Sequence, residues 1–307
     1  MPPSPRSLPL APDARRVDSA GWAALLLGGA AIGFAPIGIR LADVSPTASA
    51  FWRLALAAVV LWPAAGVRSW RTDARGHEAP AARRPLFSAA ILIAGLFFAA
   101  DLGVWHLSVA YTSVANATLE ANFAPLFVTL AGWLLFGLRV TGRFLAAMAL
   151  TLVGAAILIG PHFAASGRTL LGDALGCLTA VFYAGYMLAV KAASRRASTL
   201  QIAAGGTIVA AVAALPYALL TADRFWPRSG RGWLVLVALA VVAHAGGQTL
   251  IAYGLSRVPA AIGSVALLVQ PIMAALYAAL LLGEALTPAQ LCGGIVVLAG
   301  IWLAQRN

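Results

Sequence analysis

The sequence predicts an all-α integral membrane protein whose ten transmembrane helices form two inverted repeats of five helices each. Hydrophobic residues make up 61% of the 307 residues and charged residues only 10%, and the mean hydropathy is +0.88. A soluble domain needs a polar surface, which this composition does not supply. A helix needs about 20 mostly apolar residues to cross a bilayer, so the loops between the spans must be short.

Apolar segments of spanning length follow one another along the chain. Several begin at a proline, as at Ser45-Pro46, Val258-Pro259 and Thr287-Pro288, because the fixed φ of proline suits the first turn of a helix. The connection at Tyr111-Thr112 is so tight that its flanking helices must be antiparallel neighbours. The predicted spans cover residues 20–41, 46–66, 85–110, 113–136, 141–160, 170–191, 199–219, 231–255, 259–282 and 287–304.

The basic residues predict the orientation in the membrane. Of the 21 Lys and Arg residues, fifteen flank the spans on the side of the N-terminus, five lie on the other side, and Arg53 lies inside a span. Because Lys and Arg beside spans are retained in the cytoplasm, both termini are expected there, with the protein in the inner (cytoplasmic) membrane as a multi-pass protein. The net charge of +11 is thereby explained, and no basic stripe with interleaved aromatic residues predicts a nucleic-acid partner.

An internal repeat carries most of the functional argument. Pro125 and Pro271 align at an offset of 146 residues, as do Gly137 with Gly283 and Thr141 with Thr287. Each half has five predicted spans, and an odd number forces the second half to enter the membrane upside down. The domains predicted on this basis are a cytoplasmic tail over residues 1–19, a first repeat over 20–160, a linker over 161–169 and a second repeat over 170–304.

Particular segments add a family resemblance. The run from Ala110 to Ala117, Pro125-Leu126-Phe127, the run from Ala260 to Pro271, and Leu282-Gly283-Glu284 together resemble the EamA-type branch of the drug/metabolite transporter superfamily. The resemblance spans the whole chain and implies export of small metabolites, often amino acids, with an exporter of aromatic amino acids among the possibilities. One departure is that Gly137 is followed by Leu138, where the second half has Glu284. We interpret Glu284 as part of helix-end geometry and not as a site residue.

Three charged residues lie inside predicted spans at similar depth. They are Arg53 in the second span, Asp101 in the third and Glu120 in the fourth. A charge near the middle of a membrane costs about 3 kcal/mol on insertion scales and usually faces a cavity or a partner. Either Arg53 merely neutralises a carboxylate and locks the helices, or the surplus carboxylate binds an ammonium group or a coupling proton.

Uncharged polar residues and prolines predict a binding site on the other repeat. His244 and Gln248 are four residues apart and share a helical face, and Gln270 immediately precedes Pro271. Each of the prolines Pro125 and Pro271 removes a backbone donor near the middle of its span, so we expect a helix break in both repeats. A packing kink without a ligand is the alternative interpretation.

Aromatic residues at comparable depth are candidates for the cavity wall. The predicted substrate-binding residues are Trp105, Glu120, Tyr183, Tyr186, His244, Gln248 and Gln270, and the predicted charge cluster is Arg53, Asp101 and Glu120. A pocket with aromatic walls and few polar groups suits a mid-sized amphipathic metabolite.

These patterns predict a secondary transporter that exports amino acids or related metabolites by alternating access. No catalytic residue, metal ligand set, cofactor motif or ATP-binding loop is recognised, so an enzyme is not expected. The predicted partners are a small-molecule substrate and the lipid bilayer. Export of other metabolites or drugs by the same fold is the alternative, followed by an intramembrane enzyme and a channel or scaffold. Proton coupling, uniport and exchange all remain open. Small residues make the fifth and tenth spans candidates for contact with a second copy of the chain.

Overall fold

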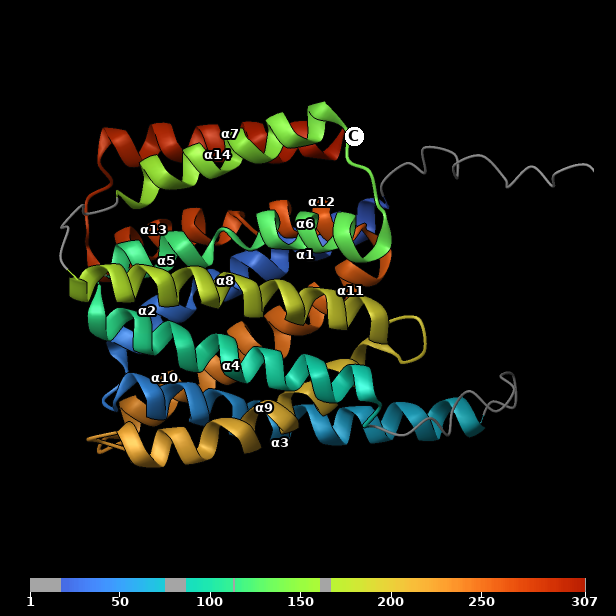
Figure 1. Ribbon diagram of the computed structural model, residues 1–307. Coiled ribbons are helices and arrows are strands. Elements are labelled where there is room, and N and C mark those ends of the chain that lie inside the picture. Colours follow the sequence, from blue (N-terminus) through green and yellow to red (C-terminus); the bar gives the residue numbers. More distant parts are fainter. Residues whose placement is uncertain (1–17, 75–86, 113, 161–166, 307) are drawn as a thin grey trace, which may run out of the picture.

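The computed structural model describes residues 18–74, 87–112, 114–160 and 167–306, and every regular element within these ranges is helical. Ten segments in this part of the chain are long and apolar enough to cross a membrane, which confirms the predicted number of spans. Figure 1 shows these helices packed side by side with their axes along one common direction. The predicted tail over residues 1–19 and the linker over 161–169 lie mostly outside the described residues.

The first five spans contain two interruptions, one in the first span and one in the fourth. Their helices are α1 (Ser19–Gly33), α2 (Ala35–Leu41), α3 (Pro46–Ala74), α4 (Ala89–Tyr111), α5 (Val114–Ala121), α6 (Ala124–Phe136) and α7 (Gly142–Ile159).

The last five spans contain an interruption in the ninth span and a π-helical segment in the eighth. A π-helix places an extra residue in each hydrogen-bonded turn and often occurs at functional sites. The elements are α8 (Gly167–Ala193), α9 (Thr199–Thr221), α10 (Gly230–Ala238), η2 (Leu239–Gln248), α11 (Thr249–Arg257), α12 (Ala260–Ala266), α13 (Val269–Leu282) and α14 (Pro288–Gln305).

The fourth span of each repeat ends in the same glycine turn. Gly137 after α6 has φ 64° and Gly283 after α13 has φ 71°, a left-handed conformation that favours glycine. The backbone N–H groups of Leu138 and Glu284 then donate to the carbonyl six residues earlier, at 3.1 and 3.3 Å. The interpretation of Glu284 as part of helix-end geometry is therefore confirmed for its backbone.

The interruptions of the fourth and ninth spans lie just before the two aligned prolines. Residues 122–123 separate α5 from α6, and residues 267–268 separate α12 from α13. Because Pro271 has no N–H, the carbonyl of Leu267 lacks its usual helical donor and accepts from the N–H of Gln270 instead, at 3.0 Å. Each span is thus interrupted near its middle, where Pro125 and Pro271 were expected to act.

The contacts between the helices of the two repeats come in matching sets. The second span packs on the seventh (α3 on α9), and the fifth on the tenth (α7 on α14). The third span packs on the sixth (α4 on α8), just as the eighth packs on the first (α11 and η2 on α1). This matching supports the predicted pseudo-two-fold relation, although the inverted orientation in the membrane stays a prediction.

The pair α7 and α14, which forms one edge of the bundle in Figure 1, is joined through glycines. A Cβ added to Gly154 would lie 2.6 Å from the backbone N of Val297, and one added to Gly293 would lie 2.5 Å from the N of Leu158. The small residues of these spans are therefore in contact within one chain. A second copy could meet only their outer faces, and a homodimer stays a prediction.

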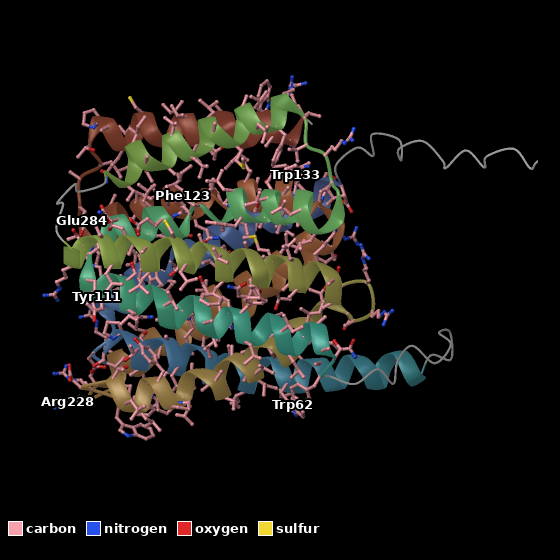
Figure 2. All side chains as sticks on the ribbon, viewed as in Figure 1. Trp62, Tyr111, Phe123, Trp133, Arg228 and Glu284 are labelled. Carbon is pink, nitrogen blue, oxygen red and sulfur yellow. The ribbon has the colours of Figure 1, made fainter. Side chains whose placement is uncertain are left out.

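The outside of the bundle carries large apolar side chains, as a surface in contact with lipid tails requires. Trp62 and Trp133, which Figure 2 labels, are 53% and 57% exposed, and leucines, isoleucines and valines of most helices are exposed with them. In the same view Tyr111, Arg228 and Glu284 lie at one end of the bundle, which we call the loop end. The end at which the described chain begins and finishes is called the terminal end.

Candidate functional site

A central cavity of about 190 Å³ lies between the two repeats. Its lining residues come from the middle of the spans and from their halves toward the loop end. The lining consists of Ile32, Gly33, Ala35, Pro36, Ile39, Arg53, Phe98, Asp101, Leu102, Trp105, His106, Thr118, Ala121, Asn122, Thr179, Tyr183, Gln248, Gln270, Pro271 and Ala274.

Arg53 and Asp101 both line this cavity, as the predicted charge cluster requires. Arg53 is only 7% exposed, and its Nε is buried without a hydrogen-bond partner among the described residues. No ion pair joins the two side chains in the described part of the chain, where the ion pairs are Arg40 with Glu284 and Arg257 with Asp18. The two side chains therefore line the same cavity without being paired with each other.

His106 adds an acceptor to the same wall. Its Nδ1 lies 2.6 Å from the carbonyl oxygen of Leu102, and a carbonyl can only accept, so Nδ1 carries the hydrogen. The Nε2 of the neutral ring is then an acceptor, and it is buried without a partner among the described residues. The Trp105 ring meets this imidazole edge to face, with the centroids 5.1 Å apart.

Two tyrosines of α8 form hydrogen bonds with glutamine side chains of the eighth and ninth spans. The Nε2 of Gln270 donates to the hydroxyl of Tyr183 at 3.3 Å, and the hydroxyl of Tyr186 donates to the Oε1 of Gln248 at 2.8 Å. The two tyrosine rings are stacked with their centroids 6.0 Å apart. All four residues belong to the second repeat, and Tyr183, Gln248 and Gln270 among them line the central cavity.

Glu120 does not join the predicted charge cluster. Thr118 and Ala121 of α5, and Asn122 just after it, face the cavity. A helix advances 100° per residue, so Glu120 points to the opposite side. It lies against Gly176 of α8, next to the carboxylate of Asp173. The three-residue cluster is therefore reduced to Arg53 and Asp101 in this structure.

His244, Tyr186 and Pro125 are also placed away from the central cavity. His244 is 3% exposed, and its Nε2 lies 2.9 Å from the hydroxyl of Thr207 in α9. Together with Tyr186 it lines a separate small pocket between α4, α9 and η2, whereas Pro125 lines neither space. Gln248 lines both the central cavity and the small pocket. The predicted shared face of His244 and Gln248 is therefore present, but only Gln248 also reaches the central cavity.

Several lining residues were not predicted. His106, Asn122 and Thr179 each lie within a helical turn of a recognised candidate, at Trp105, Pro125 and Tyr183 respectively. The i and i+4 relation on a helix was a signal that could have identified Thr179. Pro36, at the interruption between α1 and α2, was a comparable signal for the first span.

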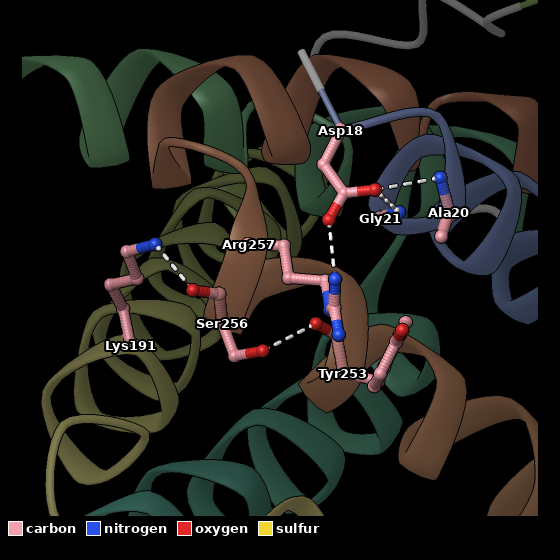
Figure 3. A network of polar contacts seen from close by, with 7 residues as sticks. All are labelled: Asp18, Ala20, Gly21, Lys191, Tyr253, Ser256 and Arg257. Carbon is pink, nitrogen blue, oxygen red and sulfur yellow. Dashed lines mark hydrogen bonds and ion pairs between the residues drawn. The ribbon is translucent and has the colours of Figure 1, made fainter. Parts of the chain in front are cut away.

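The lining of the central cavity does not reach the terminal end of the bundle, and a polar network, which Figure 3 shows, holds that closed end together. The Arg257 guanidinium donates to Asp18 Oδ2 at 2.5 Å and lies over the ring of Tyr253, with 4.5 Å to its centroid. Lys191 of α8 donates to the carbonyls of Ser256 and Val258 at 3.3 and 3.0 Å. The start of the first span, the end of the sixth and the turn between the eighth and ninth are thus tied together.

We expect Asp18→Asn to loosen this closure. The hydrogen bond from Arg257 holds the pKa of Asp18 below its usual range, assisted by the N–H groups of Ala20 and Gly21. A lowered pKa means that the contribution is present above the ordinary pKa of aspartate and is lost only as the pH falls through the lowered value. In a cysteine-free background, spin labels at Ser19 and Arg195 should report one distance distribution from pH 8 to pH 5 in the wild type, and longer distances in the variant.

The variant Arg40→Gln is the matched control, because it removes the exposed ion pair with Glu284, 2.7 Å long, at the loop end. It should leave the distance between the labels at the terminal end unchanged. Equal distributions in Asp18→Asn and in the wild type would mean that the ion pair does not hold the closure.

Comparisons with known proteins agree with this architecture. A profile of the EamA-like transporter family matches residues 19–160 and again residues 170–305. An uncharacterized transporter of Archaeoglobus fulgidus is 31% identical over 196 residues, which cover 64% of this chain and 68% of that protein. The Pseudopaline exporter CntI of Pseudomonas aeruginosa is 27% identical over 217 residues, which cover 71% of this chain and 75% of the exporter.

A solved structure, titled only as the crystal structure of a protein, superimposes with a TM-score of 0.75 over 93% of this chain and 94% of its own. At 20% sequence identity it shows the fold alone. The two family matches together take in nearly all of the described helices. The chain is a multi-pass membrane transporter and belongs to the EamA-like transporter family of the drug/metabolite transporter superfamily.

Proposed function

We propose that this transporter exports small zwitterionic metabolites, amino acids above all, across the inner membrane by alternating access. The observation that carries the proposal is Arg53, which lines the central cavity and whose Nε is buried without a hydrogen-bond partner among the described residues. A buried polar group without a partner is costly, so a ligand that supplies an acceptor relieves this cost. A carboxylate is the acceptor whose geometry matches a guanidinium.

Another part of the lining suits an ammonium group. Asp101 and His106 both line the cavity, and a carboxyl oxygen and the Nε2 of a neutral imidazole can both accept hydrogen bonds. Trp105 and Tyr183 supply aromatic surface beside them for an apolar or aromatic side chain. A molecule that carries a carboxylate, an ammonium group and an apolar part therefore uses every wall of the cavity, as a neutral amino acid does.

The direction of transport rests on two supports. The excess of arginines on the terminal side favours a cytoplasmic location of both termini, which makes the loop end the outer end. One relative with 27% identity is named as an exporter. With the terminal end closed and the cavity on the loop side, the structure corresponds to the outward-facing state in this scheme.

Asp101 is the carboxyl group through which a proton would be coupled, because it faces the cavity while Glu120 and His244 do not. Proton coupling at Asp101 would make uptake into liposomes respond to an imposed pH gradient. Uniport or exchange would give saturable uptake that ignores the gradient. Both schemes use the same binding site.

The test is uptake by liposomes that contain the purified protein, with a panel of labelled neutral amino acids and with and without a pH gradient. For an amino acid that is taken up saturably, we expect competition by other zwitterions. The corresponding amine without a carboxylate should compete about 10- to 100-fold less well, since a hydrogen bond to a charged group contributes about 1.5–3 kcal/mol. Equal competition by the amine would contradict a carboxylate site at Arg53.

A further inference from the structure

A second cavity, larger than the central one, lies near the terminal end. Its volume is about 260 Å³, and it separates α7 from α6 and α12. Val128, the lining residue deepest along α6, forms its floor and is 1% exposed, and Phe144, near the start of α7, is 3% exposed. Leu138 and Arg139, in the connection between α6 and α7, form part of its rim. It shares no lining residue with the central cavity, so it is a separate site.

The position of the rim relative to the membrane follows from the ends of the spans. The fourth span ends at Leu135 and the fifth begins at Gly142, so residues 137–141 lie at the level where the helices leave the hydrocarbon. Trp133, exposed beside this end of α6 in Figure 2, is the kind of residue that marks the boundary between tails and head groups. The mouth of the cavity is therefore level with lipid head groups, and its floor is level with lipid tails.

The lining also changes in polarity from the rim of the cavity to its floor. Its deep part is mostly apolar, and an apolar cavity of about 150 Å³ already takes up a benzene ring in preference to water. At the rim, Arg139 is the charged member of the lining within the described residues, and no carboxylate accompanies it. The cavity thus has a mostly apolar interior and one exposed positive charge at its rim.

We propose that this cavity binds an acyl chain of an anionic phospholipid from the leaflet at the terminal end, with the lipid phosphate against Arg139. The chain occupies the space between α7 and α6, and the head group stays at the membrane surface. The occupant is a lipid rather than a soluble metabolite, because the mostly apolar lining reaches the outer surface of the bundle at Leu138, which is 59% exposed.

The first experiment uses the delipidated wild-type protein in detergent and measures binding by native mass spectrometry. Phosphatidylglycerol and phosphatidylcholine with the same acyl chains are compared with glycerophosphoglycerol and inorganic phosphate. We expect one saturable phosphatidylglycerol site with about fivefold preference over phosphatidylcholine, the contribution of one arginine near a membrane surface. The two probes without chains should not bind. Binding of inorganic phosphate with the affinity of the lipid would overturn the proposal in favour of a simple anion site.

Variants then assign the site to this cavity. Arg139→Gln should abolish the head-group preference and leave phosphatidylcholine binding unchanged, while Arg143→Gln, one turn further along, is the control because Arg143 does not line the cavity. A side chain at Gly132 has room, since the nearest atom to an added Cβ is 3.7 Å away on Leu138, so Gly132→Leu should fill the cavity and remove both lipids.

Gly103→Leu is the control for the added bulk, because no described atom lies within 4 Å of a Cβ added there. Monodisperse elution on size exclusion establishes that each variant is folded. Wild-type lipid binding by a folded Gly132→Leu variant would overturn the proposal. So would an unchanged preference for phosphatidylglycerol in Arg139→Gln, which does not depend on packing.

Discussion

The variant Arg53→Gln is expected to raise the half-saturation concentration for transport by about 10- to 100-fold. Arg53 lines the central cavity, is 7% exposed, and keeps its Nε free of hydrogen-bond partners among the described residues. Glutamine retains a polar end but has neither the positive charge nor the paired N–H groups that a carboxylate binds. Concentration-dependent uptake into liposomes measures the effect, and Arg53→Lys should restore part of the affinity because it keeps the charge.

A loss of folding would imitate this result, because the substitution removes the positive charge that lines the same cavity as the carboxyl of Asp101. An ionisable group inside a membrane protein that loses its opposite charge destabilises the fold. The double variant Arg53→Gln with Asp101→Asn removes this imbalance and should regain the thermal stability of the wild type without regaining transport. Wild-type kinetics in the single variant would exclude Arg53 from the binding site.

The second large effect is expected on stability, from Gly154→Leu. An added Cβ alone would meet the backbone of α14 at 2.6 Å from the N of Val297 and 2.9 Å from the carbonyl oxygen of Gly293. Backbone atoms cannot move aside as a flexible side chain does, so α7 and α14 must separate. Overpacking of this kind costs about 3 kcal/mol or more, which lowers the unfolding temperature by on the order of 5–10 °C.

Thermal unfolding in detergent checks this, with Gly103→Leu as the control for a leucine added to a glycine inside a spanning helix. The control should unfold within about 2 °C of the wild type, since a single surface change is usually within 0.5 kcal/mol. Equal unfolding temperatures for both variants would mean that the glycine contact between α7 and α14 contributes little.

The sequence predicted the architecture well because the strongest signals act over whole spans. Runs of about 20 apolar residues are dictated by membrane thickness, so their number could be counted directly. The aligned glycines Gly137 and Gly283 carried information of the same kind, since a left-handed helix end strongly favours glycine. Pro125 and Pro271 likewise marked the interruptions of the fourth and ninth spans, to within a few residues.

The side chains around the cavity were predicted less well, because their direction depends on small rotations of each helix. Span depth alone grouped Glu120 with Asp101, yet Glu120 points toward α8 because its helix presents Thr118 and Asn122 to the cavity. His244 seemed equivalent to Gln248, but its partner Thr207 is supplied by another span, which nothing local in the sequence specifies. His106 was missed because its role depends on a hydrogen bond to its own backbone at Leu102.

The position of α7 and α14 at the edge of the bundle makes α14 a suitable place to attach a marker for electron microscopy. Neither helix contributes a residue to the central cavity, and their glycine faces are turned toward each other. A rigid helical protein fused in continuous register after Gln305 would extend α14 beyond the membrane without touching the binding site. For a transporter of 31.5 kDa with little mass outside the bilayer, such an added marker would supply the features that electron microscopy needs to align its particles.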